Sequence, residues 1–94
     1  MKIINTFTSG TLESSDIMIT LSPGDGISIT VDSAVYSLYG KTIENIISQV
    51  ISEFEISDVS VFAKDNGARD YVIRARVESA IKKSIKRGVA NGGN

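Results

Sequence analysis

The chain contains no cysteine and no histidine, and proline occurs only once. Without cysteine there is no disulfide framework and no thiolate nucleophile, and without histidine there is no imidazole base for a catalytic triad. A zinc site built from cysteine and histidine ligands is excluded for the same reason. Catalysis by this chain would have to depend on carboxylates, lysine or tyrosine, so the sequence gives little support to an enzyme with its own active site.

Long apolar runs and a strong net charge are also missing. The longest apolar runs span only a few residues, as at 61–63, whereas a membrane-spanning helix needs about 20. The first residues lack the apolar core of a signal peptide. Ten basic and eleven acidic residues give a net charge of −1, which argues against strong non-specific binding of nucleic acid. We therefore expect a cytoplasmic protein that binds neither nucleic acid nor membrane.

The 94 residues, of which 41% are apolar, are typical of one domain with a single core. Residues 1–16 are rich in serine, threonine and glycine and show no clear period, so we expect an exposed arm. Residues 88–94 are predicted to form a flexible tail. The sequence thus predicts one domain over residues 1–94, with an exposed segment at each end.

Three segments alternate between apolar and polar residues, as strands with one buried face do. The first two cover residues 17–21 and 27–31, and the Pro-Gly-Asp-Gly sequence at 23–26 between them predicts a β-hairpin. The third segment, over about 56–64, is predicted to be a later strand of the same sheet.

Apolar residues recur with helical spacing in two further segments. A short helical turn over 34–39 is expected to end at Gly40, and a longer helix follows with an apolar stripe from Ile43 to Phe54. The last helix is predicted over about 68–87. Together these elements predict an α+β fold, a two-layer sandwich in which a small three-stranded sheet packs against two main helices. Because the last strand follows a helix, we also expect a βαβ-like crossover.

Charged residues offer only weak chemical candidates. Glu13 and Asp16 bracket two serines, but two carboxylates without a third ligand do not make a convincing metal site, so no metal is predicted. Asp65 and Asp70 flank Gly67, where capping of the last helix is the common role for aspartate. The last helix is basic, which is typical of a solvated face or, alternatively, of a surface for a phosphate group or an acidic partner. Its basic residues are Arg69, Arg74, Arg76, Lys82, Lys83, Lys86 and Arg87.

Two segments resemble the acyl carrier proteins of citrate lyase, the gamma chains of that complex. Residues 10–16, Gly-Thr-Leu-Glu-Ser-Ser-Asp, are similar to the modification loop of the family. Residues 65–78 are similar to its Asp-Lys-Gly-Ala-Leu-Asp segment, which runs into Ile-x-Ala-Arg-x-Glu. Asn66 stands where lysine is usual and Arg69 where leucine is usual. We expect both of these departures to lie away from the serine loop.

The resemblance implies a non-catalytic carrier subunit. It implies that 2′-(5″-phosphoribosyl)-3′-dephospho-coenzyme A is joined through a phosphodiester to Ser14, with Ser15 as the second choice. The thiol of this group would carry acetyl and citryl between the alpha (transferase) and beta (lyase) subunits while citrate is cleaved to acetate and oxaloacetate. The implied partners are these two subunits and a prosthetic-group transferase. Arg69, Arg74 and Arg76 would then neutralise phosphates of the group or dock an acidic partner.

Two alternatives remain open at this point. The chain is also compatible with the acyl carrier of malonate decarboxylase, which uses a related prosthetic group. A small α+β interaction module without a prosthetic group would explain the composition but not the two matching segments. A four-helix phosphopantetheine carrier is disfavoured, because the alternating segments are typical of strands.

Overall fold

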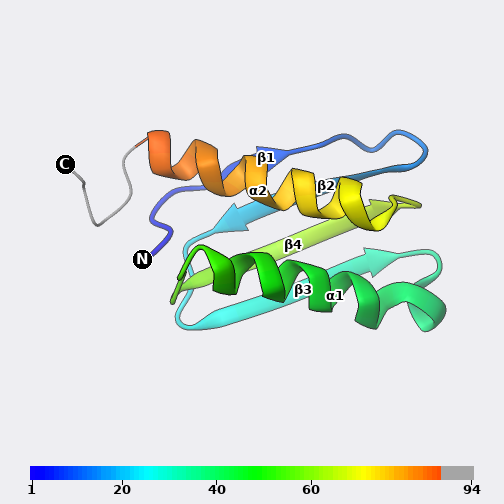
Figure 1. Ribbon diagram of the computed structural model, residues 1–94, viewed down its shortest axis with the longest axis horizontal. Coiled ribbons are helices and arrows are strands. Elements are labelled where there is room, and N and C mark those ends of the chain that lie inside the picture. Colours follow the sequence, from blue (N-terminus) through cyan, green and yellow to red (C-terminus); the bar gives the residue numbers. More distant parts are fainter. Residues whose placement is uncertain (88–94) are drawn as a thin grey trace.

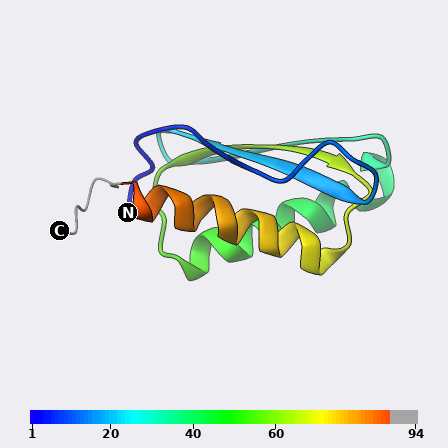
Figure 2. The same cartoon turned by 90° about the horizontal axis from the view of Figure 1, so that it is seen from above.

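In the computed structural model, which describes residues 1–87, four strands form one sheet and two helices cover one of its faces (Figure 1, Figure 2). This arrangement confirms the predicted two-layer α+β sandwich. The predicted tail at 88–94 lies outside the described residues. The elements are β1 (Phe7–Ser9), β2 (Asp16–Ser22), β3 (Ile27–Ser33), α1 (Tyr36–Glu53), β4 (Val59–Asn66) and α2 (Asp70–Lys86).

The sheet has four strands rather than the predicted three, because part of the N-terminal segment joins it. β1 pairs antiparallel with β2, and Phe7 lies opposite Leu21. The first residues are also attached, since the amide of Ile3 donates to the carbonyl of Asp58 over 3.0 Å. A strand of three residues is too short to show a period, which is why the sequence predicted an exposed arm. Within the predicted arm, residues 11–15 form the longest exposed stretch.

The predicted hairpin between β2 and β3 is wrong, because β4 lies between them in the order β1-β2-β4-β3. β4 pairs antiparallel with β2 on one side and parallel with β3 on the other, so it is a central strand with both edges bonded. The turn at 23–26 crosses the start of β4 instead of closing a hairpin. There the amide of Val59 donates to the carbonyl of Gly26 over 2.9 Å. The expected βαβ crossover is confirmed as β3–α1–β4.

α1 is one continuous helix from Tyr36 to Glu53, and the predicted interruption at Gly40 is absent. Gly40 is buried, and a Cβ added to it would lie 2.2 Å from the ring of Tyr36. Glycine is therefore present at this position because the ring of Tyr36 packs onto the helix backbone, and not because the helix ends there. The helical spacing from Ile43 onward is confirmed.

The core lies between the sheet and the two helices. The strands contribute their inward residues and the helices their apolar stripes, all almost fully buried, which removes apolar surface from water and holds the layers together. Neither described helix is long and apolar enough to cross a membrane. The most deeply buried side chains include Ile17, Ile19, Leu21, Ile47, Val50, Val59, Ala63, Val77, Ala80 and Ile81.

Candidate functional site

The loop formed by residues 10–15 connects β1 to β2. It lies at the end of the molecule where β4 ends and both helices begin (Figure 1). Ser14 and Ser15 are both exposed in this loop. Ser15 has a positive φ of 65°, and its amide donates to the carbonyl of Asn66 over 2.8 Å. Neither the hydroxyl of Ser14 nor that of Ser15 has a hydrogen-bond partner within residues 1–87, so both oxygens are accessible from solvent.

Asp16, at the start of β2, anchors the loop to α2. Its carboxylate accepts from Arg76 Nε at 3.0 Å and Arg76 Nη2 at 2.8 Å. It also accepts from the amide and the hydroxyl of Thr11, at 3.1 and 2.6 Å, and from the amide of Ile17 at 2.7 Å. The hydrogen bonds from Arg76, followed by that from Thr11, hold the pKa of Asp16 well below its ordinary value. Asp16 is thus ionised and its oxygens are occupied by the chain itself.

Gly10 permits the close approach of the two strands that flank the loop. Its φ is +94°, and a Cβ at this position would lie 1.9 Å from the carbonyl oxygen of Ile17. Any other residue would push the loop away from β2 in addition to straining the backbone. Packing of the loop against β2 therefore explains why glycine occupies position 10, independently of any role of the serine.

Asn66 lies directly against the serine loop, so the expectation that it lies away from it is wrong. It is the last residue of β4 and stands opposite Asp16 in the register. Its side-chain amide donates to the carbonyl of Leu12 over 3.0 Å, and its own carbonyl accepts from Ser15. No sequence pattern indicates this role, because 50 residues separate Asn66 from Asp16 along the chain and only strand pairing brings them together.

Asp65 shapes the turn between β4 and α2 without capping the helix in the predicted way. Its carboxylate accepts from the hydroxyl of Ser33 over 2.9 Å and from the amide of Ala68 over 3.0 Å. The residue at the N-cap of α2 is Arg69, and Asp70 is the first residue of the helix. Asp65 thus ties the ends of β3 and β4 to the turn that precedes α2.

The three arginines proposed to bind phosphate or an acidic partner have different surroundings. Arg76 is paired with Asp16, and Arg74 is paired with Glu53 and, over 3.2 Å, with Glu78. Arg69 is exposed and forms no ion pair with the residues that the structure describes. Arg69 is therefore the member of this set with a charge that is still available for a ligand.

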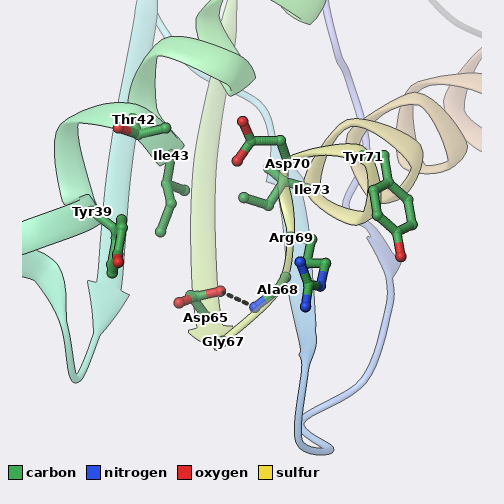
Figure 3. Close-up of a pocket in the computed structure, with 10 residues that line it drawn as sticks. All are labelled: Tyr39, Thr42, Ile43, Asp65, Gly67, Ala68, Arg69, Asp70, Tyr71 and Ile73. Atoms are coloured by element: carbon green, nitrogen blue, oxygen red, sulfur yellow. Dashed lines mark hydrogen bonds between the residues drawn. The ribbon is translucent and has the colours of Figure 1, made fainter.

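A hollow of about 550 Å³ lies beside the loop, between the beginnings of α1 and α2 and over the end of β4 (Figure 3). Tyr39 and Ile43 approach it from α1, and Ile73 and Asp70 approach it from α2. Residues 67–69 form part of its rim.

The candidate metal ligands Glu13 and Asp16 are not joined by a third ligand. Across residues 1–87, the structure brings together no group of three or more acidic side chains suited to hold a metal ion. What distinguishes this end of the molecule is thus an exposed serine hydroxyl on a loop that is fixed from β2, β4 and α2.

Comparison with known proteins agrees with this picture. Residues 4–84 match a family of acyl carrier proteins described as the malonate decarboxylase delta subunit (MdcD). The fold is similar to a chain in the crystal structure of a Pseudomonas malonate decarboxylase hetero-tetramer in complex with malonate. The TM-score is 0.68 at 16% identity, and the match covers 89% of this chain and 88% of the other. At this identity the likeness concerns the fold alone.

The relatives found by sequence are more similar to this chain. Each match covers almost the full length of both this chain and the relative. The citrate lyase acyl carrier protein of Haemophilus ducreyi is 36% identical over 90 residues, which are 96% of this chain and 95% of the relative. That of Lactobacillus acidophilus is 42% identical over 87 residues, which are 92% of this chain and 90% of the relative. These relatives are carrier subunits rather than catalytic ones. The chain belongs to the citrate lyase acyl carrier protein family.

Proposed function

We propose that Ser14 is the attachment point of a covalent 2′-(5″-phosphoribosyl)-3′-dephospho-coenzyme A group, and that the chain carries acyl groups for citrate lyase. An acyl carrier role follows from the family, whereas this group and this residue are our proposal. The observation that carries it is the Ser14 hydroxyl, which is exposed and unbonded on a loop that is fixed through the side chains of Thr11, Asp16 and Asn66. The hydroxyl of Ser15 is exposed and unbonded as well, and Ser14 is preferred because it holds the position of the modified serine in the matching segment. A transferase can reach such a hydroxyl without unfolding the protein.

The residues present fit a group that is attached once by another enzyme. The buried carboxylate of Asp16 is not available as a base for Ser14, because both of its oxygens already accept hydrogen bonds from Arg76, Thr11 and Ile17. The chain therefore presents the oxygen, and the transferase must remove its proton. Glu13 is the exposed carboxylate next to Ser14 that the transferase can recognise.

When bound, the group supplies what the polypeptide lacks, namely a thiol for thioester chemistry. The chain's own contribution is positional. Asp16 and Asn66 fix the loop, so that the attachment point keeps a defined place on the molecule while the rest of the group extends from it. A tethered acyl group meets each active site at a high effective concentration, which is the purpose of a carrier.

The proposed partners are the alpha subunit, which would exchange acetyl for citrate, the beta subunit, which would cleave the citryl moiety, and the prosthetic-group transferase. We place this exchange in the cytoplasm. The malonate decarboxylase hetero-tetramer that contains the similar fold supports assembly with other subunits.

A carrier for malonate decarboxylase is the second candidate, supported by the family match over residues 4–84. The identity of 16% to the structure from that enzyme is far below the identities of 36% and 42% to the citrate lyase carriers of Haemophilus ducreyi and Lactobacillus acidophilus. We therefore favour citrate lyase. Loading of the group would also exclude an interaction module without a prosthetic group.

Paired serine variants test the attachment site. We expect the wild-type chain and Ser15→Ala to gain the mass of the group when co-expressed with the transferase and the enzymes that make its donor, and Ser14→Ala to gain none. Intact-mass spectrometry measures the change, and circular dichroism confirms that both variants fold. A Ser14→Ala chain that still gains the mass would move the site to Ser15 or elsewhere.

A further inference from the structure

The hollow beside the loop has the size and the lining of a small-molecule site. Its volume of about 550 Å³ lies within the range of known ligand pockets, roughly 300–1,000 Å³. Ile43 and Ile73 provide apolar walls from the two helices, and the aromatic side chain of Tyr39 stands at the α1 side (Figure 3). Tyr39 is 57% exposed, so its ring is not packed into the core and can contact a ligand.

Polar groups of both signs border the same hollow. The unpaired guanidinium of Arg69 lies at the rim and suits a phosphate. The carboxylate of Asp70 and the hydroxyl of Thr42 are acceptors that suit an exocyclic amino group. Asp65 adds a second negative charge, but its oxygens already accept from Ser33 and Ala68. An apolar and aromatic wall with a cation at the rim and acceptors inside is the chemistry of a site for a nucleoside phosphate.

The hollow lies within reach of the proposed attachment serine. The amide of Ser15 is bonded to the carbonyl of Asn66 at 2.8 Å, and Asp16 bridges to Gly67. Consecutive Cα atoms are about 3.8 Å apart, so Ser14 and Arg69 are separated by no more than about 20 Å. In the proposed group the adenosine is bonded through its 2′ oxygen to the phosphoribosyl unit that joins the serine. The adenosine is thus nearer to Ser14 than the pantetheine portion and its thiol are.

We propose that the hollow between the beginnings of α1 and α2 binds the adenosine portion of the group attached to Ser14. This inference rests on the proposed function. Tyr39 stacks on the adenine, Asp70 or Thr42 accepts from its amino group, and Arg69 pairs with a phosphate. The base is then fixed on the carrier, and the pantetheine portion with the thiol remains outside, free to reach the partner subunits. Because the adenosine is already fixed, the group loses less conformational entropy when its thiol is placed in the active site of a partner subunit.

The hollow can be tested on the unmodified chain with an untethered probe. We expect titration of ¹⁵N-labelled protein with 3′-dephospho-coenzyme A to shift amide resonances of Thr42 and of residues 67–70 in a saturable way. Tyr39→Ala should weaken this binding roughly fivefold or more, as loss of one base–aromatic stack does. Leu38→Ala is the matched control, since Leu38 is the neighbouring residue, is 74% exposed and does not line the hollow. It should leave the binding unchanged.

A second pair of variants separates the hollow from general attraction of anions. Arg69→Gln should weaken binding of the probe, whereas Arg87→Gln, at the opposite end of α2, should not. Shifts confined to residues 83–87 and sensitive to Arg87→Gln would overturn the proposal, as would equal effects of Tyr39→Ala and Leu38→Ala. Shifts around the hollow that appear only on addition of a partner subunit would also contradict it, and would indicate a protein-docking surface.

Binding of adenosine in the hollow and attachment of the group to Ser14 can fail independently, and the measurements distinguish the two failures. If the loaded chain carries the group on Ser14 by mass but its amide shifts at residues 67–70 equal those of the unmodified chain, the hollow is not the site and the function stands. If no group is found on Ser14, the proposed function fails while binding of the free probe is still measured.

Discussion

At the scale of single residues, Asp16 determines how the serine loop is held. It is 8% exposed and accepts five hydrogen bonds, two of them from Arg76. Replacing its carboxylate removes the charge that Arg76 faces and leaves the guanidinium partly enclosed without its partner. We expect Asp16→Asn to lower the free energy of unfolding at pH 7 by roughly 1–3 kcal/mol, measured by urea denaturation. Asp25→Asn, in an exposed turn, is the control and should change little.

The pH dependence of this effect has a definite sign. Because the pKa of Asp16 is lowered in the folded state, the stabilisation is complete above the ordinary value of 3.8 and is lost as the pH falls below it. The difference between wild type and Asp16→Asn should therefore shrink between pH 5 and pH 2. A difference that stays constant over this range would show that the ion pair with Arg76 does not stabilise the fold.

Gly10 gives a second prediction for the same loop. In Gly10→Ala the new Cβ meets the carbonyl oxygen of Ile17, and the backbone keeps a positive φ. Gly26→Ala has a similar φ of +78° but nothing within 4 Å of the new atom, so it carries the backbone strain alone, about 1–2 kcal/mol. We expect Gly10→Ala to destabilise the protein more than Gly26→Ala does in thermal unfolding. Equal shifts in melting temperature would contradict the close approach of Gly10 to β2.

At the scale of elements, α1 shows why a local pattern can give the wrong boundary. Glycine is a poor helix former and ends many helices, so the sequence predicts a stop at residue 40. In the structure the ring of Tyr36 occupies the space that a Cβ of residue 40 would need, and its hydroxyl donates to Glu44. The glycine belongs to a packing contact within one helix.

This contact predicts a non-additive pair of mutations. On propensity alone, Gly40→Ala should stabilise the helix by roughly 0.5–1 kcal/mol. We expect the single variant to lose this gain because the ring of Tyr36 must move and its hydrogen bond to Glu44 breaks. In a Tyr36→Ala background the same change should stabilise. Chemical denaturation of the four chains gives the coupling energy, and additive effects would show that Tyr36 does not lie against Gly40.

The strands show a similar limit of sequence patterns. Alternation correctly identified β2, β3 and β4, because each has one face toward the helices. It did not reveal that β4 bonds on both edges, since pairing depends on hydrogen bonds between backbones and leaves no period in the sequence. The turn at 23–26 has the composition of a hairpin, yet it crosses the start of β4, where a Cβ added to Gly24 would lie 2.7 Å from the carbonyl carbon of Val59.

At the scale of the whole molecule, the fold class and the two helices followed from the sequence, and the surroundings of the serine did not. The positions of Ser14 and Ser15 in the matching segment could be recognised directly. The contacts of Asp16 with Arg76 and of Asn66 with Leu12 span 60 and 54 residues, so only the folded chain brings them together. The hollow likewise requires the beginnings of both helices to meet at the end of β4 (Figure 3).

One arrangement follows from these contacts and underlies the proposed function. β2, β4 and α2 together fix a loop at one end of the molecule, and that loop exposes the unbonded hydroxyls of Ser14 and Ser15, of which we assign Ser14 as the attachment point. The polypeptide has no thiol, so its role as an acyl carrier depends on a group added from outside. The central claim is therefore chemical and concerns one oxygen atom.

Mass spectrometry of the native protein tests this claim most directly. The chain should be isolated from cells that are cleaving citrate, because a recombinant preparation without the transferase lacks the modification for trivial reasons. We predict an intact mass raised by the phosphoribosyl-dephospho-coenzyme A group, with the added mass mapped by peptide fragmentation to Ser14. A native chain with the unmodified mass, or with the group on a residue outside the loop at 10–15, would contradict it.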